Sequence, residues 1–428
     1  MAISLSSFTN PNSYTKETRG TQLITGFLAG SSFNIGATYS GNTITADPGG
    51  MFGWLVYSRY FKQSPTKGGT SDTYIVYTTP NDLVNDFNAL GGSTGAILAR
   101  NTGDTYGLFL NNGNNTLSGI TNGKDFLLAI SYLAYGGALV ITGSTTGFNN
   151  YTNTTGKNID VLMGSCATAA ISQWLINNPY TTGVFASQSN GSGYTAANFD
   201  SLFGSPSYVA FGDSPAVADR VFNVYGQKTV SNFNTSSVLG SSTLTYTQTA
   251  VPDVCGFFAR AKDRNELYLT VAGIDRSTVL NGSVDNTVAW SDATLKTILK
   301  NNRVNYFLSY NPKFLGQDLV GATAATTDVT VNERVGPAQM KAAMDRDITN
   351  IGLKYLYDIN NEATRTLVTN EILAYLQQYT TFIDTTKTQV VCDSSNNTDN
   401  ATTLNILVSV TPRLGVTSFV INVNLSST

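Results

Sequence analysis

The sequence predicts an α/β (or α+β) protein: a mixed β-sheet with helices packed on it, followed by a C-terminal domain of two helices and a small β-sheet. Three patterns indicate this fold class. Strands and helices alternate between about residues 71 and 187, apolar residues recur at helical spacing between 337 and 379, and every second residue from 419 to 425 is apolar. With 428 residues, the chain is longer than a single hydrophobic core usually supports, so we expect several domains.

The alternating region contains three strand and helix units. A strand over 73–77 precedes a helix that opens at Thr79 with Pro80 in its first turn. A helix within 124–137 then ends at paired glycines and leads into the strand ALVIT, and residues 158–187 repeat the order strand, helix, strand. Such alternation favours a sheet with partly parallel pairing.

Domain boundaries follow from changes in composition. Residues 227–250 are poor in charge and rich in Ser and Thr, which indicates an extended connector with some strand character. We therefore expect four parts, namely an extended N-terminal arm at 1–20, an α/β domain at 21–250, a C-terminal domain at 251–415 and a terminal strand at 416–428.

Two helices are predicted in the C-terminal third. The first begins near Pro337, and its apolar stripe recurs every three or four residues, at Met340, Met344, Ile348, Ile351 and Tyr355. Its opposite face carries the charged residues Lys341, Asp345, Arg346 and Asp347. The second helix starts near Glu362, with Asn361 as its expected cap, and continues to about Tyr379.

Two strands are predicted at the end of the chain. The first, NILVSV, runs into Pro412, which cannot donate to a β-ladder. The second places four apolar residues on one face, Phe419, Ile421, Val423 and Leu425. Because no charge lies between 416 and 428, this strand would expose an unprotected edge. It pairs either within its own chain or with another copy by β-augmentation.

Composition excludes several classes of function. Histidine is absent, which removes histidine-based catalysis and most zinc, copper and iron sites. The net charge of −3 and the lack of a Lys/Arg cluster argue against nucleic-acid binding. The stretch GITNGKD has three residues between its glycines, whereas a phosphate-binding Walker loop needs four. We expect no catalytic residue, cofactor or metal.

The N-terminus and the cysteines give further expectations. No basic start followed by an apolar stretch opens the chain, and no apolar run is long enough to cross a bilayer, so we expect a soluble protein without direct membrane insertion. The three cysteines, Cys166, Cys255 and Cys392, lie too far apart for a zinc knuckle. With no histidine to activate it, Cys392 is expected to be a small, half-buried core residue before a turn that begins at Asp393.

Several segments, taken in order, resemble the sheath proteins of contractile phage tails and related contractile injection machines. The strongest is TQVVCDSSNNTDNATTLNILVSVTPRLGVTSFVINVNL at 388–425, which resembles the closing pattern of that family. The other similar segments are NPNSYTKETRG at 10–20, VPDVCGFFARAKDRNELYLTVAG at 251–273, TLKTILKNNRVNYFLSY at 294–310, VNERVGPAQMKAAMDRDI at 331–348 and NNEATRTLVTNEILAYLQQ at 360–378.

The resemblance implies a non-enzymatic structural subunit. Such subunits polymerise helically around an inner tail tube and contract to drive the tube through a target cell envelope. It also implies contacts with baseplate and tail terminator proteins, a place in the virion tail, and assembly in the host cytoplasm.

The resemblance further implies that both ends of the chain enter neighbouring subunits and complete a shared sheet. The candidate residues are Tyr14, Lys16 and Glu17 in the N-terminal arm, and Phe419, Ile421, Val423 and Leu425 in the terminal strand. Lys341 and Arg346 are candidates for contacting the tube, since relatives use a C-terminal helix there. The alternative for these two residues is an ordinary solvated helix face.

Two other function classes stay open. The Asn, Thr, Ser and Tyr content suits a β-rich virion adhesin or carbohydrate-binding surface protein, which would lack paired helices at 337–379 and behave as a monomer or trimer. A carboxylate-based hydrolase would need two acids facing one cleft, and no motif surrounds the acidic residues.

Overall fold

The structure is a computed structural model of the chain. It describes residues 16–28, 37–40, 43–46, 74–83, 125–142, 144–164, 169–186, 220–233, 244–301, 303–321 and 333–414. Cys166, Tyr14 and the four apolar residues of the predicted terminal strand lie outside these residues.

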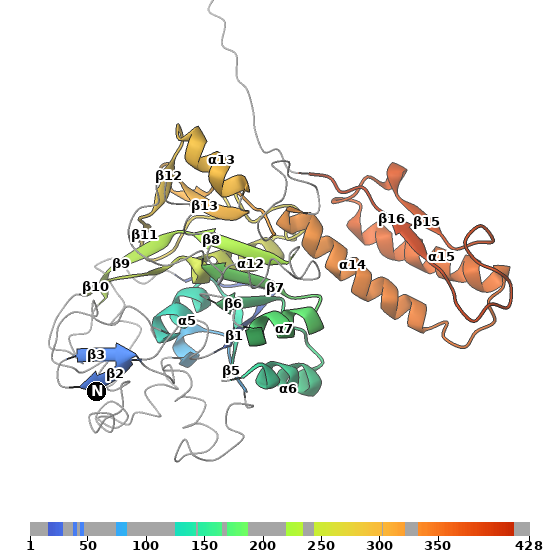
Figure 1. Ribbon diagram of the computed structural model, residues 1–428, viewed down its shortest axis with the longest axis horizontal. Coiled ribbons are helices and arrows are strands. Elements are labelled where there is room, and N and C mark those ends of the chain that lie inside the picture. Colours follow the sequence, from blue (N-terminus) through green and yellow to red (C-terminus); the bar gives the residue numbers. More distant parts are fainter. Residues whose placement is uncertain are drawn as a thin grey trace, which may run out of the picture. The chain divides into compact units, whose positions relative to one another are not determined.

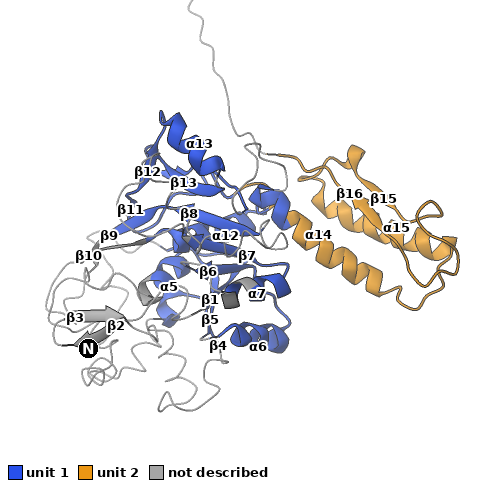
Figure 2. Cartoon of the chain, in the orientation of Figure 1, with its two compact units in different colours: residues 1–267, 271–339 blue, residues 268–270, 340–428 orange. Residues whose placement is uncertain are grey.

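The chain divides into two compact units, coloured separately in Figure 2. Unit 1 comprises residues 1–267 and 271–339, and unit 2 comprises 268–270 and 340–428. This division differs from the boundary expected at residue 250, because the segment that follows contributes a central helix to unit 1.

Unit 1 is built on a nine-stranded mixed sheet, in the order β12-β13-β8-β7-β6-β1-β5-β4, with β14 paired to β13 (Figure 1). Strands β4 and β14 are antiparallel to their neighbours, and the other pairs are parallel. The strands are β1 (Ile24–Leu28), β4 (Tyr74–Tyr77), β5 (Ala138–Thr142), β6 (Val161–Gly164), β7 (Thr182–Ala186), β8 (Val221–Tyr225), β12 (Thr287–Ala289), β13 (Val304–Ser309) and β14 (Phe314–Leu315). The predicted mixed sheet is confirmed.

Both faces of this sheet are buried, as parallel sheets require. In β5, Leu139 and Ile141 join the core beneath helices α5 (Asp125–Leu133) and α12 (Val251–Asp263). Val140, which points the other way, joins a second core under α6 (Thr145–Thr155) and α7 (Ala169–Asn177). The predicted helices before β5 and between β6 and β7 are confirmed as α5 and α7.

Helix α12 is the central helix of unit 1. Every residue from Val251 to Ala261 is buried, and the helix contacts α5, β6 and β7. Its burial on all sides explains why the chain does not divide at residue 250.

Smaller elements complete unit 1. Strands β9 (Gln227–Phe233), β10 (Leu244–Thr249) and β11 (Ser283–Val284) form a three-stranded sheet, so the predicted strand character of 227–250 is confirmed. Helix α13 (Ala293–Asn301) covers β12 and β13 over a separate apolar cluster. Strands β2 (Ala37–Ser40) and β3 (Thr43–Ala46) form a two-stranded antiparallel sheet.

Unit 2 contains most of α14 (Val335–Leu353) and all of α15 (Glu362–Leu376). The predicted stripe from Met340 to Tyr355 lies in the unit 2 core, and Asn361 caps α15 by accepting a hydrogen bond from the Thr364 N–H at 3.0 Å. Two short 3-10 helices, η6 (Gln377–Tyr379) and η7 (Thr385–Lys387), lead to the antiparallel pair β15 (Gln389–Val391) and β16 (Leu407–Ser409).

Among the helices of the described ranges, none combines the length and apolar character required to cross a bilayer.

Candidate functional site

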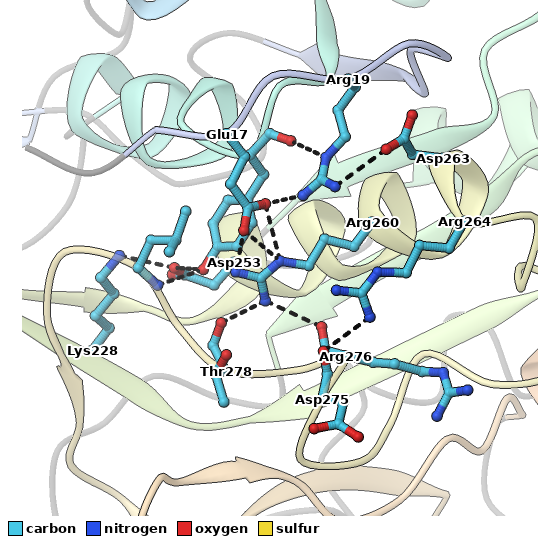
Figure 3. Close-up of polar contacts among 12 residues, drawn as sticks. Glu17, Arg19, Lys228, Asp253, Arg260, Asp263, Arg264, Asp275, Arg276 and Thr278 are labelled. Atoms are coloured by element: carbon cyan, nitrogen blue, oxygen red, sulfur yellow. Dashed lines mark hydrogen bonds and ion pairs between the residues drawn. The ribbon is translucent and has the colours of Figure 1, made fainter.

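The N-terminal segment is fastened to helix α12 by a cluster of charged side chains (Figure 3). Its first contact is a backbone hydrogen bond, in which the N–H of Glu17 donates to the carbonyl oxygen of Ala134 at 2.7 Å. The Glu17 carboxylate then receives the guanidinium of Arg260, with Nε 3.0 Å from both oxygens and Nη2 2.9 Å from Oε1. Arg19 pairs with the same carboxylate. We call Glu17, Arg19, Arg260 and Asp263 the anchor.

Asp263, in the last turn of α12, holds the next residues of the segment. Its Oδ1 accepts the backbone N–H groups of Gly20 and Thr21 at 3.0 and 3.1 Å, and Oδ2 lies 3.4 Å from Arg19 Nη1. The Thr21 N–H first, and then Arg19, favour the ionised carboxylate and outweigh its slight desolvation, so the pKa of Asp263 lies below its usual value.

The turn after α5 receives the N-terminal segment. Gly136 has φ of +76°, and a Cβ built there would lie 2.7 Å from Arg19 Cγ and 2.9 Å from the Glu17 carbonyl oxygen. Arg19 Nε also donates to the carbonyl oxygen of Tyr135 at 3.1 Å. The glycine that ends α5 therefore also makes room for the anchor.

Arg260 also braces the chain after α12. Its Nη1 donates to the carbonyl oxygens of Arg276 and Thr278, at 3.1 and 2.6 Å, and its guanidinium lies 4.7 Å from the centre of the Tyr135 ring. Hydrogen bonds from a charged donor are stronger than neutral ones, and this guanidinium is almost entirely buried. One side chain thus ties the N-terminal segment, α5 and the 276–278 loop together.

A buried ion pair lies next to Tyr135. Lys228 Nζ is 2.8 Å from Asp253 Oδ1, and both residues are buried. The Tyr135 hydroxyl donates to the same oxygen at 2.7 Å and accepts the Leu280 N–H at 2.8 Å. Burial, followed by the charge of Asp253, raises the pKa of Tyr135 well above its usual value. Replacing such a pair with apolar residues is often neutral for stability, whereas removing one partner leaves an uncompensated buried charge.

Gly256 lets the Tyr135 ring reach this ion pair. A Cβ at Gly256 would lie 2.2 Å from Tyr135 Cγ, so only glycine fits at this position of α12. Glycine inside a helix costs about 1 kcal/mol relative to alanine, which indicates that ring placement outweighs helix propensity here.

The contacts of the anchor are those of a structural attachment and not of a catalytic site. Its carboxylates are engaged by guanidinium groups or backbone N–H groups, so none is placed as a base beside a nucleophile. Burial, and then Asp253, raise the pKa of the Cys255 thiol well above its usual value, which keeps it protonated and unreactive. Within the described residues, no group of three or more Cys, Asp or Glu side chains could hold a metal ion.

Unit 2 holds the two predicted tube-contact residues. Lys341 is exposed and pairs with Asp345 one turn later, Nζ to Oδ2 at 2.9 Å. Arg346 is half-buried and pairs with Asp347, Nε to Oδ1 at 2.6 Å. Asp347 also accepts the Tyr375 hydroxyl at 2.9 Å, and these bonds from Arg346 and Tyr375 outweigh partial burial and lower its pKa. The two basic residues therefore differ: Lys341 faces solvent, whereas Arg346 belongs to a polar cluster with Tyr375.

Cys392 is more deeply buried than the half-buried residue expected, and the expected turn follows it. The thiol is buried in the unit 2 core, and burial raises its pKa. Asp393 Oδ1 accepts the Ser395 N–H at 2.7 Å, and Asn397 bonds the backbone of Asn405 from both ends of its amide. This turn sets β15 against β16.

Of the candidates for links between subunits, Lys16 and Glu17 are the two that lie within the described residues. Glu17 lies in the anchor, where its partners belong to its own chain, and Lys16 is exposed.

Sequence reasoning missed Arg260 and Asp263. The run ARAKDRNE, which is dense in charge in a chain with only 12% charged residues, was the available signal.

Comparisons with known proteins identify the fold. No protein-family model matches the sequence, and no curated protein matches it. A solved chain of the PVC sheath complex, an extracellular contractile injection system in its contracted state, is 11% identical and superposes with a TM-score of 0.59, covering 99% of this chain and 95% of that one.

Two structures of the anti-feeding prophage (AFP) are also similar. A chain of its baseplate is 12% identical, with a TM-score of 0.55 over 98% of this chain and 99% of that one. A chain of its contracted helical sheath is 11% identical, with a TM-score of 0.54 over 99% and 97%. The chain therefore has the fold of the sheath proteins of contractile injection systems.

Proposed function

We propose that this chain is the repeating subunit of a contractile sheath, which polymerises helically around an inner tube and contracts to drive the tube through a target cell envelope. The observation that carries the proposal is the shared fold over nearly the whole length of a contracted sheath subunit. The absence of histidine and the engaged carboxylates of the anchor support a structural role.

Both ends of the chain act as links between copies. The anchor lies next to the first described residue, Lys16, so a neighbour that holds residues 1–16 would pull on the central helix of unit 1 through Glu17 and Arg260. Within the described residues β15 and β16 form a two-stranded sheet, and a sheet of that size is marginal in water. Residues 416–428 of another copy, with Phe419, Ile421, Val423 and Leu425 on one face, supply a further strand.

Contraction draws its work from contacts between sheath bodies. The extended assembly, held by its strand links, is kinetically trapped. Contraction buries more surface between neighbouring subunits and needs no nucleotide hydrolysis. Baseplate and terminator proteins cap the two ends, and the assembled sheath belongs to the virion or injection particle, with assembly in the host cytoplasm.

The tube contact uses α14. Lys341 is exposed and, within the described residues, pairs with the exposed Asp345, so it is available to a tube surface at little cost. Arg346 supports this surface from the Asp347 and Tyr375 cluster. Lys341→Glu should leave unfolding unchanged and weaken tube co-sedimentation. Unchanged co-sedimentation would show that Lys341 does not contact the tube and lies on an ordinary solvated helix face.

The adhesin alternative is disfavoured by the helices of unit 2. It required the absence of paired helices at 337–379, and α14 and α15 occupy that region.

Negative-stain microscopy of the purified chain tests the proposal. We expect helical tubes from the full chain and far fewer from a chain that lacks 416–428. A full chain that stays monomeric or forms discrete trimers under all assembly conditions would contradict the sheath function, whereas normal tubes from the truncated chain would contradict only the strand link.

A further inference from the structure

The chain passes from unit 1 into unit 2 at two places. Residues 268–270 belong to unit 2, although Leu267 before them and Val271 after them belong to unit 1 (Figure 2). We call residues 268–270 the strap. The second passage is in α14, which is continuous across the boundary between residues 339 and 340. Unit 2 is therefore joined to unit 1 by the strap as well as by a helix.

The chain enters the strap in a defined direction, because a Schellman motif closes the end of α12. The Glu266 N–H donates to the carbonyl oxygen of Ala261 at 2.7 Å, and the Asn265 N–H donates to that of Lys262 at 3.1 Å. Asn265 has φ of 55°, the left-handed conformation that this motif requires. The strap thus begins a few residues beyond Asp263 of the anchor.

Neighbouring residues of this stretch pack into the cores of different units. Leu267 packs against the core of unit 1, and Val271 is completely buried in it. Tyr268 and Leu269, which lie between them, pack against the core of unit 2. Leu267 and Tyr268 are adjacent, and Thr270 alone separates Leu269 from Val271. Because one residue of extended chain spans at most about 3.6 Å, the strap has almost no slack.

Tyr268 holds the strap in unit 2 through two ring contacts. Its ring centre lies 5.4 Å from that of Tyr379 and 5.5 Å from that of Phe382, and the second contact is edge-to-face. Both partner side chains are buried. Burial, followed by the effect of Tyr379, raises the pKa of Tyr268 above its usual value. Aromatic pairs stabilise beyond the area that they bury, so these contacts resist withdrawal of the strap.

The partner rings continue into the polar cluster of α14. The Tyr375 hydroxyl lies 2.7 Å from that of Tyr379 and donates to Asp347 at 2.9 Å. Asp347 in turn pairs with Arg346. Tyr268 is therefore attached to side chains that connect α15 with α14, and not to a surface loop of unit 2.

We propose that the strap is a second attachment, which makes α12 and unit 2 move together. A domain joined by one connection can swing about it as a hinge, whereas a second short connection removes most of that freedom. The attachment follows from the fold alone. Its consequence rests on the proposed sheath function: a pull on unit 2 reaches the end of α12 that holds the anchor, so both ends of the chain load the same helix.

Distances between spin labels in the full chain test this attachment. Lys157→Cys in unit 1 and Lys387→Cys in unit 2 are exposed labelling positions. All chains carry Cys166→Ser, and the chain without added cysteines is the labelling control, because Cys255 and Cys392 are buried. Dilution with unlabelled chain restricts the measurement to distances within one copy. We expect one narrow distance distribution when the strap is unmodified.

Two changes to the strap should broaden this distribution. Four glycines inserted on each side of the strap keep Tyr268 and add a flexible reach of roughly 10 Å per insertion, and the distribution should widen by several ångströms. Tyr268→Ala should widen it as well, whereas Tyr268→Phe keeps both ring contacts and should leave it narrow. A distribution that Tyr268→Phe widens as much as Tyr268→Ala would overturn the role of the ring contacts.

A label pair within unit 2 separates release of the strap from unfolding. Lys341→Cys and Lys387→Cys both lie in unit 2, and their distance distribution should stay narrow with the glycine insertions. A broad distribution between the units in the unmodified chain, or a narrow one after the insertions, would overturn the attachment. Loss of tubes in the unmodified chain would instead refute the sheath function, since the distances are measured whether or not the copies assemble.

Discussion

Arg260 and Glu17 form an ion pair between residues 243 positions apart in the sequence, with Arg260 Nε 3.0 Å from both carboxylate oxygens. The pair fixes the point at which the N-terminal segment leaves the body of unit 1 (Figure 3). Because Arg260 lies in the buried part of α12, force on that segment acts on the core of the unit and not on a surface loop.

Removing the anchor guanidinium should release the N-terminal segment. Arg260→Gln leaves Glu17 without its main partner, and the expected loss of stability is about 3 kcal/mol, the lower end for a broken buried pair, since Glu17 is 26% exposed. Trypsin cleavage after Arg19 should become faster. Arg264→Gln, on the same helix end and exposed, is the control and should change neither property. Equal protection of Arg19 in both variants would refute the anchor.

The buried ion pair should show strong coupling. Lys228→Met leaves Asp253 unpaired, and Asp253→Asn leaves Lys228 unpaired, so each single change should cost about 3–5 kcal/mol in the free energy of unfolding. The double variant has no buried charge to compensate and keeps an acceptor for Tyr135. It should therefore cost at least about 1 kcal/mol less than the sum of the singles. Additive losses in urea unfolding would show that the two side chains act independently.

Gly256 and Gly352 should respond oppositely to alanine. Gly256→Ala forces a clash with the Tyr135 ring and should lower the melting temperature. The nearest atom to a Cβ at Gly352 in α14 is Ile406 Cδ1 at 3.9 Å, so Gly352→Ala should be neutral or stabilise by up to about 1 kcal/mol. Thermal unfolding of both variants measures this, and a stabilised Gly256→Ala would contradict the packing of Tyr135.

Acid should weaken the grip of Asp263. Its pKa is lower in the folded than in the unfolded chain, so its contribution to stability is complete above the unfolded value near 3.8 and is lost as the pH falls through the lower folded value. The unfolding free energy of the unmodified chain should therefore converge with that of Asp263→Asn on acidification from pH 5 to pH 3. A constant difference between the two chains over this range would contradict the lowered pKa.

Local patterns in the sequence predicted those helices and strands that bury one face of regularly spaced apolar residues. Helices α14 and α15, and the step from α5 to β5, follow from apolar spacing and from caps such as Asn361. Helix α6 was not predicted, because its sequence TTGFNNYTNTT is rich in poor helix formers. Burial of Phe148 and Tyr151 outweighs that low propensity.

The anchor could not be predicted from local sequence. Glu17 and Arg260 meet only after the sheet and α12 have formed, and the same holds for Lys228 and Asp253. Charged residues in a sequence show their sign but not their partner. The resemblance to sheath proteins, by contrast, depends on the order of segments along the chain, and the shared fold confirms it.

Cryo-electron microscopy of tubes assembled from the unmodified chain tests the central claim most directly. We predict that residues 416–428 of each copy pair as a strand with β15 or β16 of a different copy, while Glu17 stays bound to Arg260 of its own chain. A density map in which residues 416–428 pair with unit 2 of their own chain, with no strand crossing between copies, would contradict the account.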